Sequence, residues 1–356
     1  MKDKKFPIFY ICLLILIVIV VVLTELGKSQ LKDVLKEYED SQPKYVAEDF
    51  LESNFTGSVG KACAQLFASQ ISEYESEESI AAYFDDVTAG QEFALQSVST
   101  GVGGDLQYVV KCDNKKFVTF SIVKSGETTE HGFDLYRLSD AVLNEKLLNT
   151  YSIKVPIGYS LTVNGVAADV QYCLGDRIET ESQEFMPEGV DGIVYTTYMF
   201  PKLCGEPTFA VTAPNGKICE VMQNEDGVYH AKIAYDDALA DAYSEYVVEA
   251  TKAYACYLQK DAGFAKVGKY MDPTSQLYAN IKSSPNWMVI DHNSYDFEDI
   301  QTSEFYAYSE DVFSCRVTLT HVLKYPRLDD YRDALDITWY LRKVDGQYLI
   351  YNSFTR

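Results

Sequence analysis

Side chains that act as nucleophiles, bases or metal ligands are few in this sequence, and they are dispersed. The 356 residues include four histidines, which lie far apart in the chain. They are His131, His230, His292 and His321. The sequence contains no G-x-S-x-G nucleophile motif, no H-E-x-x-H zinc motif and no phosphate-binding glycine loop. We therefore predict no catalytic residue, no cofactor-binding residue and no metal site, and we expect that the protein is not an enzyme.

His321 is the histidine whose position best suits acid–base chemistry. It shares strand parity with the apolar residues of the segment 313–319, so we expect it to face inward near a strand end. Arg316 and Asp336 have the opposite parity and are expected on another face. Because no carboxylate of its own parity accompanies His321, general base catalysis is weakly indicated. We favour a satisfied or rim histidine, and we name His321 and Trp339 as candidate pocket residues only.

An uncharged apolar run near the N-terminus is expected to determine where the rest of the chain lies relative to a membrane. The run from Pro7 to Leu23 is close to the roughly 20 residues that cross a bilayer core. Three lysines precede it, at positions 2, 4 and 5, and the positive-inside rule places that end in the cytoplasm. The run is longer than the apolar region of a cleaved signal peptide and lacks a small-residue cleavage site. Residues 1–24 are therefore predicted to be a cytoplasmic tip and a transmembrane signal anchor.

The rest of the chain is acidic and is expected to fold. The net charge is −22, and the first five residues contribute +2, so the remainder carries −24. Such a surface stays soluble and repels nucleic acid, so we expect no nucleic-acid partner. A hydrophobic content of 47% argues against disorder.

Hydrophobic periodicity divides the exterior part into a stalk and three domains. Residues 25–42 have helical spacing up to Ser41-Gln42-Pro43 and are predicted to be a helical stalk. Residues 43–146 start with helical pieces, punctuated by Gly57 and Gly60, and continue as antiparallel strands. Residues 147–233 contain strands and turns only, with hairpins predicted at Asn164-Gly165 and Asn215-Gly216. Residues 234–356 again place helices before strands.

The long helix predicted at 236–259 carries a stripe of aromatic residues. Four tyrosines lie on it, at Tyr243, Tyr246, Tyr254 and Tyr257. They could line a groove for a sugar or a peptide, since tyrosine suits recognition surfaces. Their helical spacing is also that of a core stripe, and we favour the core.

The first and third domains share their element order and a cysteine pattern. Cys63 and Cys256 lie on the early helical part of each domain, whereas Cys112 and Cys315 lie on a strand. We infer two distant copies of one fold, with Cys63–Cys112 and Cys256–Cys315 as candidate disulfides. Buried free cysteines are the alternative, because connectivity cannot be read from a sequence.

Two short stretches resemble known families. The stretch DITWYLRKVDGQYLIY (Asp336–Tyr351) resembles the nuclear-transport-factor-like cone fold. The version of this fold on the exterior of bacterial cells is the MecA-type N-terminal domain of penicillin-binding proteins. The stretch YSIKVPIGYSLTVNGV (Tyr151–Val166) resembles the small β-domain of TcaA-like membrane proteins. The resemblance implies an α+β fold, in which two cone-like domains, each helices plus a curled antiparallel sheet, flank a small all-β module. It covers most of residues 43–354 in architecture.

These features lead to one expected function and two alternatives. We expect a single-pass, membrane-anchored, extracytoplasmic binding or scaffolding protein of the bacterial cell envelope. The resemblance implies a role near cell-wall synthesis or wall stress, with an envelope protein or a wall polymer as partner. The first alternative is a small-molecule binder or enzyme that uses a cone-fold cavity. The second is a structural spacer. The sequence does not indicate an oligomeric state.

Overall fold

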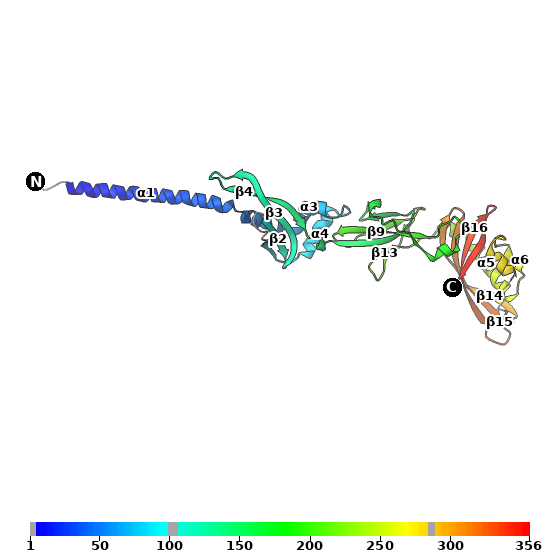
Figure 1. Cartoon of the computed structure of the whole chain (residues 1–356). Coiled ribbons are helices and arrows are strands. Elements are labelled where there is room, and N and C mark those ends of the chain that lie inside the picture. Colours follow the sequence, from blue (N-terminus) through cyan, green and yellow to red (C-terminus); the bar gives the residue numbers. More distant parts are fainter. Residues whose placement is uncertain (1–4, 99–105, 284–288) are drawn as a thin grey trace. The chain divides into compact units, whose positions relative to one another are not determined.

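The computed structural model of the protein describes residues 5–98, 106–283 and 289–356. It is a mixed α+β structure with an N-terminal apolar helix and, in the described residues, four sheets (Figure 1). The chain forms two compact units, 1–150 with 200–207, and 151–199 with 208–356. The lysines at positions 2 and 4 of the expected cytoplasmic tip lie outside the described residues.

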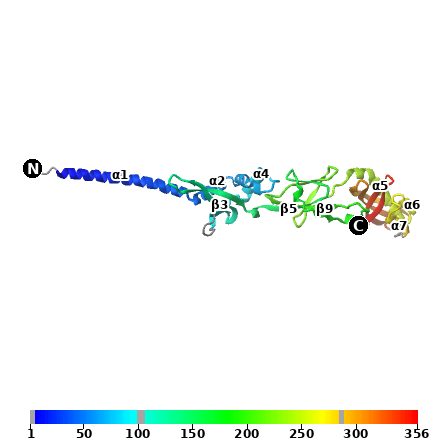
Figure 2. The ribbon, with the colours of Figure 1, turned by 45° about the horizontal axis from the view of Figure 1, so that its top comes forward.

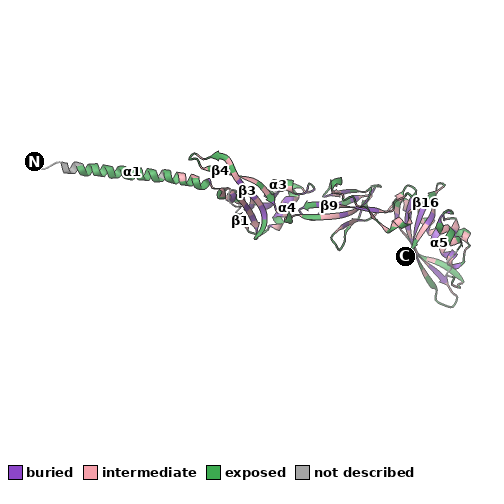
Figure 3. Ribbon diagram, viewed as in Figure 1, coloured by how far each residue is buried: buried purple, intermediate pink, exposed green. Residues whose placement is uncertain are grey.

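Helix α1 (Lys5–Asp40) contains the apolar run and continues beyond it. Within the described residues it is the one helix long and apolar enough to span a membrane. Its apolar side chains from Phe9 to Leu23, including Cys12, are all exposed, so no other part of the described structure covers them (Figure 3). The helical spacing of the segment after the apolar run agrees with α1, which ends at Asp40, and Pro43 starts the next helix.

Three helices pack against a four-stranded antiparallel sheet in the first unit. The helices are α2 (Pro43–Phe55), α3 (Val59–Phe67) and α4 (Glu77–Val87). The strands, in spatial order, are β1 (Phe93–Val98), β2 (Leu106–Cys112), β3 (Lys115–Thr128) and β4 (Asp134–Leu143). The core contains Phe84 of α4 against Phe117 of β3, with ring centroids 5.8 Å apart.

Gly60 was expected to separate two helical segments, but it has a different role. It lies inside the first turn of α3 and does not interrupt a helix. A Cβ atom at this position would be 1.9 Å from the carbonyl oxygen of Ala81 on α4. Glycine is therefore required by the close approach of two helices.

The all-β segment of the second unit forms two small sheets, which run β12-β13-β5-β9-β8 and β11-β10-β6-β7. Residues 200–207, at the end of β9 and beyond, belong to the first unit. The hairpin expected at Asn164-Gly165 is confirmed, because Val163 pairs with Val166 and both turn residues have positive φ. The strands are β5 (Asn149–Pro156), β6 (Ser160–Val163), β7 (Val166–Ala167), β8 (Ile178–Glu179), β9 (Val194–Leu203), β10 (Phe209–Thr212), β11 (Ile218–Cys219), β12 (Val221–Gln223) and β13 (Tyr229–Ala231).

The C-terminal part of the second unit places three helices beside a second four-stranded antiparallel sheet (Figure 2). The helices are α5 (Asp237–Gln259), α6 (Phe264–Gly268) and α7 (Gln276–Ser283). The strands, in spatial order, are β14 (Ser294–Ser309), β15 (Val312–Lys324), β16 (Tyr331–Val344) and β17 (Gln347–Thr355). Asp236 caps α5, since its side chain accepts a hydrogen bond from the backbone N–H of Leu239 at 3.0 Å.

Residues of the expected β module (147–233) and of the expected C-terminal domain (234–356) fall in the same compact unit, apart from 147–150 and 200–207. The division into a stalk and three domains stays a prediction.

Candidate functional site

Strand alternation gives the C-terminal sheet two chemically different faces. On β15, Cys315, Val317 and Leu319 belong to the core that α5 covers. Ser314 and Arg316 lie between them in the sequence and so point to the opposite face. We call these the helix side and the outer face.

Trp339 lies in the core on the helix side. It is buried, and its indole N–H donates a 2.8 Å hydrogen bond to the hydroxyl of Thr251 on α5. The ring of Tyr254 meets its edge at a centroid distance of 5.6 Å. Trp339 is therefore a satisfied core residue that ties α5 to the sheet.

His321 also lies on the helix side, with no exposed surface. Its ring stacks on Phe297 at a centroid distance of 4.7 Å, and Tyr295 packs against it edge-on at 5.4 Å. Neither ring nitrogen has a hydrogen-bond partner in the described structure. The satisfied or rim histidine that we favoured is therefore wrong, because strand parity predicts burial but does not supply a partner.

The surroundings of His321 favour its neutral form. Burial lowers the pKa of His321, and His292 lowers it further, whereas the nearby carboxylates of Asp261 and Asp333 act in the opposite direction. Each ring nitrogen of His292 faces a hydrogen-bond acceptor, since Nε2 lies 3.1 Å from Asp261 Oδ2 and Nδ1 lies 2.7 Å from the carbonyl oxygen of Ile290.

The four cysteines named as candidate disulfides are buried free thiols in the structure. Cys63 and Cys112 lie in the core of the first unit, and Cys315 lies in that of the second. Burial raises the pKa of the Cys63 thiol to about 12, so little thiolate forms near neutral pH. The two bridges, Cys63–Cys112 and Cys256–Cys315, stay predictions.

The tyrosine stripe of α5 belongs to the core, as we favoured. Tyr257 is buried, and its hydroxyl donates to the carbonyl oxygen of Ile281 at 2.9 Å. Tyr243, Tyr246 and Tyr254 are partly buried and pack against the same core.

The outer face carries a ladder of paired charges. The Arg316 guanidinium donates to both carboxylate oxygens of Asp336, at 2.8 and 2.6 Å, and to Glu304 Oε1 at 3.0 Å. Arg356 donates to the other oxygen of Glu304 at 2.9 Å. Hydrogen bonds from Arg316 lower the pKa of Asp336, so the pair is charged throughout the neutral range. The ladder combines two positive and two negative groups.

A recess of about 280 Å³ lies over this ladder, and we call it the outer-face pocket. One wall is aromatic: Phe185 and Tyr340 stack at 4.7 Å, and Phe354 lies 5.6 Å from Phe185. The remaining lining combines hydroxyl and charged groups with two isoleucines. Its residues are Thr180, Glu181, Ser182, Ile193, Ile233, Glu304, Tyr306, Tyr308, Ser314, Thr338 and Arg356.

One hydroxyl of the outer-face pocket is unusual. Thr338 is only 6% exposed, and its Oγ1 atom has no hydrogen-bond partner in the described structure. Its neighbours are satisfied, since the Tyr308 hydroxyl lies 3.0 Å from Ser314 Oγ. Burial raises the pKa of Tyr308 to about 12, so this phenol stays neutral and keeps its proton.

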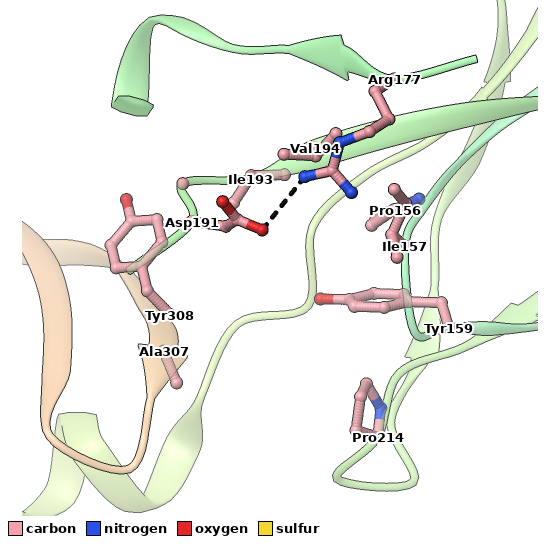
Figure 4. A pocket seen from close by; sticks show the side chains of 11 residues that line it. Pro156, Ile157, Tyr159, Arg177, Asp191, Ile193, Val194, Pro214, Ala307 and Tyr308 are labelled. Atoms are coloured by element: carbon pink, nitrogen blue, oxygen red, sulfur yellow. Dashed lines mark hydrogen bonds and ion pairs between the residues drawn. The ribbon is translucent and has the colours of Figure 1, made fainter. Parts of the chain in front are cut away.

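A second recess, of about 260 Å³, shares Ile193 and Tyr308 with the first. Figure 4 shows Asp191 and Tyr308 on one side of it and Tyr159 and Pro214 on the other. Arg177 donates to Asp191 at 3.0 Å across its mouth. Because both side chains are largely exposed, this ion pair contributes little to stability.

The two recesses suit binding better than covalent chemistry. Their described linings contain neither histidine nor cysteine, and the carboxylates of Glu304 and Asp191 are each hydrogen-bonded to an arginine. No group of three or more His, Cys, Asp or Glu side chains among the described residues is arranged to hold a metal ion. The sequence did not reveal the outer-face pocket, because its walls combine the segment 180–193 with strands more than a hundred residues later.

Comparisons with known proteins add little. No family model matches this sequence, and no curated protein matches it. One similar solved structure is described as an "Ntf2 like protein involved in plasmid conjugation". It is 12% identical, the match covers 83% of this chain and 89% of that chain, and the TM-score is 0.24. At this score the similarity supports no inference about this chain.

Proposed function

We propose that this chain is a membrane-anchored binding or scaffolding protein of the bacterial cell envelope, with its bulk outside the cytoplasm. The observation that carries this proposal is the outer-face pocket, which combines an aromatic wall with polar groups. A few convergent polar groups in an otherwise apolar recess are the usual means of orienting a ligand. The apolar helix α1 and the lysines before it support the anchor and its orientation.

The finer architecture belongs to the proposal. Each four-stranded sheet with its helices is a cone-like domain of the nuclear-transport-factor type, and the segment 147–233 is a TcaA-like β module. The support is the resemblance at Asp336–Tyr351 and at Tyr151–Val166, together with the matching orders β1-β2-β3-β4 and β14-β15-β16-β17. The same resemblance supports a role near cell-wall synthesis or wall stress, with an envelope protein or a wall polymer as partner.

Small-molecule binding or catalysis on the helix side is the second candidate. The observation that favours it is the pair of unpartnered nitrogens of His321, which a bound ligand would satisfy. It ranks below the first candidate because His321 has no exposed surface from which a ligand could reach it.

Retention of envelope components by the full chain tests the first proposal. The detergent-solubilised protein would be immobilised and exposed to purified wall polymer and to a detergent extract of the envelope. Phe354→Ala removes a 40% exposed ring from the outer-face pocket, and Leu328→Ala removes a 73% exposed apolar side chain from a loop outside it. We expect retention by the wild type and by Leu328→Ala, and a loss with Phe354→Ala.

Two results would contradict this proposal. Equal retention by an unrelated acidic protein of similar charge would mean that the interaction is nonspecific. If nothing is retained, the structural spacer becomes the better account of the chain.

A further inference from the structure

We propose that the outer-face pocket takes a neutral, polyhydroxylated ligand, namely one or two sugar rings; this inference rests on the binding function proposed above. Four properties of the pocket carry it: its charge, its hydroxyl groups, its aromatic wall and its size.

The charge of the pocket argues against an anionic ligand. Both acidic groups of the ladder are hydrogen-bonded to arginine, and the two signs cancel. Among the described lining residues, the one arginine, Arg356, donates to Glu304 at 2.9 Å, so its charge is already paired. Glu181 adds a negative charge at the rim, and the chain as a whole carries −22. An anionic ligand would therefore be repelled, whereas a neutral one would not.

The hydroxyl groups define what a ligand must offer. Thr338 lines the recess, and its buried Oγ1 lacks a partner in the described structure, so a ligand that hydrogen-bonds to it removes the cost of an unpaired group. Because this oxygen is covered in the unliganded protein, the side chains over it must shift to admit the ligand. A hydroxyl group of the ligand can donate a hydrogen bond to the Thr338 oxygen or accept one from it. The hydroxyls of Ser182, Ser314 and the neutral Tyr308 offer the ligand the same kind of partner. Hydroxyl groups at this density match a polyol better than a hydrocarbon.

The aromatic wall and the volume narrow the class further. Phe185, Tyr340 and Phe354 present an apolar surface beside the hydroxyl groups, since Phe354 is the strand partner of Thr338 and Tyr340 that of Ser314. A sugar ring has the same division, with C–H groups on its faces and hydroxyls around its edge, and aromatic side chains suit such amphipathic partners. A volume of about 280 Å³ lies at the lower end of ligand pockets, which limits the occupant to one or two rings.

Saturation-transfer NMR on the full chain tests this inference. The protein would be held in a detergent without a sugar head group, because such a head group would compete for the pocket. The probes are glucose, N-acetylglucosamine and cellobiose as neutral sugars, with glucuronate and glucosamine as charged counterparts. We expect transfer to the neutral sugars and weaker transfer to glucuronate.

Two isosteric variants make the test specific. Thr338→Val removes the unpartnered hydroxyl from the pocket, and losing one hydrogen bond should weaken sugar binding by about 2- to 10-fold. Thr119→Val removes a buried, unpartnered hydroxyl from the sheet of the first unit and should leave the affinity unchanged. Both variants keep the side-chain shape, so both should fold.

Three results would overturn the inference. The first is no transfer to any neutral sugar at about 10 mM, which is ten times a millimolar dissociation constant. The second is stronger transfer to glucuronate than to the neutral sugars. The third is an equal loss of affinity in the two variants. If sugars fail while envelope components are still retained in a manner sensitive to Phe354→Ala, the ligand class is wrong but the proposed binding function stands.

Discussion

Replacing His321 with leucine is expected to stabilise the protein. Each buried polar atom without a partner costs about 1–3 kcal/mol, and the imidazole has two of them. Leucine has a similar volume and no polar atom, although it loses the ring stacking on Phe297, worth about 0.5–1.5 kcal/mol. Allowing for imperfect repacking, we expect a net gain of about 1–3 kcal/mol. Since 1 kcal/mol corresponds to roughly 2–4 °C for a unit of this size, the melting temperature should rise by about 2–12 °C.

Thermal unfolding of the full chain at pH 8, followed by circular dichroism, measures this effect, because the lowered pKa of His321 keeps its imidazole neutral there. His292→Leu is the matched control, because both ring nitrogens of His292 face hydrogen-bond acceptors and its replacement removes those contacts. We expect this variant to be less stable than the wild type. If His321→Leu loses 1 kcal/mol or more, the imidazole has a partner in solution, and the dry, unpartnered site inferred for it is wrong.

The same variant has a defined pH dependence. The pKa of His321 in the folded protein lies below its unfolded value of about 6.5, so the unfolded chain binds the proton more tightly. Stability should therefore fall as the pH drops below about 6.5, by at most about 1.4 kcal/mol per pH unit. His321→Leu removes this contribution while leaving Asp261, Asp333 and His292 in place. The stability difference between variant and wild type should grow from pH 7.5 to pH 5.5, and a constant difference would refute the assignment to His321.

Two further substitutions test the packing of each unit by denaturant unfolding. Gly60→Ala should destabilise the first unit by about 1–3 kcal/mol, since the new methyl meets the Ala81 carbonyl at 1.9 Å, whereas Gly57→Ala has open space and should be nearly neutral. Arg342→Met should cost about 3–5 kcal/mol, because it leaves the fully buried Asp272 carboxylate without its guanidinium partner. An unchanged transition midpoint in either case would contradict the contact that motivates it.

The elements that the sequence predicts well are those with a local cause. The turn at Asn164-Gly165 forms because both residues tolerate positive φ, and this holds whatever surrounds the hairpin. The helix near 236–259 is predictable for the same reason, since its cap and its apolar stripe lie within it. An element whose cause lies within its own residues can therefore be predicted without knowing the rest of the fold.

Strand β14 was not predicted, and its backbone explains why. Three register irregularities interrupt its pairing with β15, and Asp299 and Glu304 have positive φ within it. Each irregularity shifts the alternation of buried and exposed side chains, so no period of two survives in the sequence. Its residues are also mostly exposed, which removes the apolar signal. The pairing with β15, which lies later in the chain, is what makes this segment a strand.

The candidate site depends even more on contacts between distant segments. Arg316 and Asp336 were assigned to the same parity class from the sequence, but their pairing requires the register between β15 and β16. Phe185 comes from a segment that has no periodic pattern, and it closes the pocket only by stacking on Tyr340. A pattern can therefore indicate which face a residue occupies, but not which side chain it meets there.

The two unpartnered groups of the C-terminal sheet, His321 and Thr338, separate stability from function. Each lowers the stability of the unliganded protein, because a buried polar atom loses its hydrogen bonds to water and gains none in the protein. His321 is sealed on the helix side, so removing it should bring only a gain. Thr338 lines a recess, so removing its hydroxyl should bring a gain in stability and a loss of ligand affinity together. That opposite response is the one expected of a site kept for binding at the expense of the fold. If Thr338→Val gains stability with no loss of affinity for any sugar, its hydroxyl is a defect of packing like that of His321, and the outer-face pocket loses its strongest support.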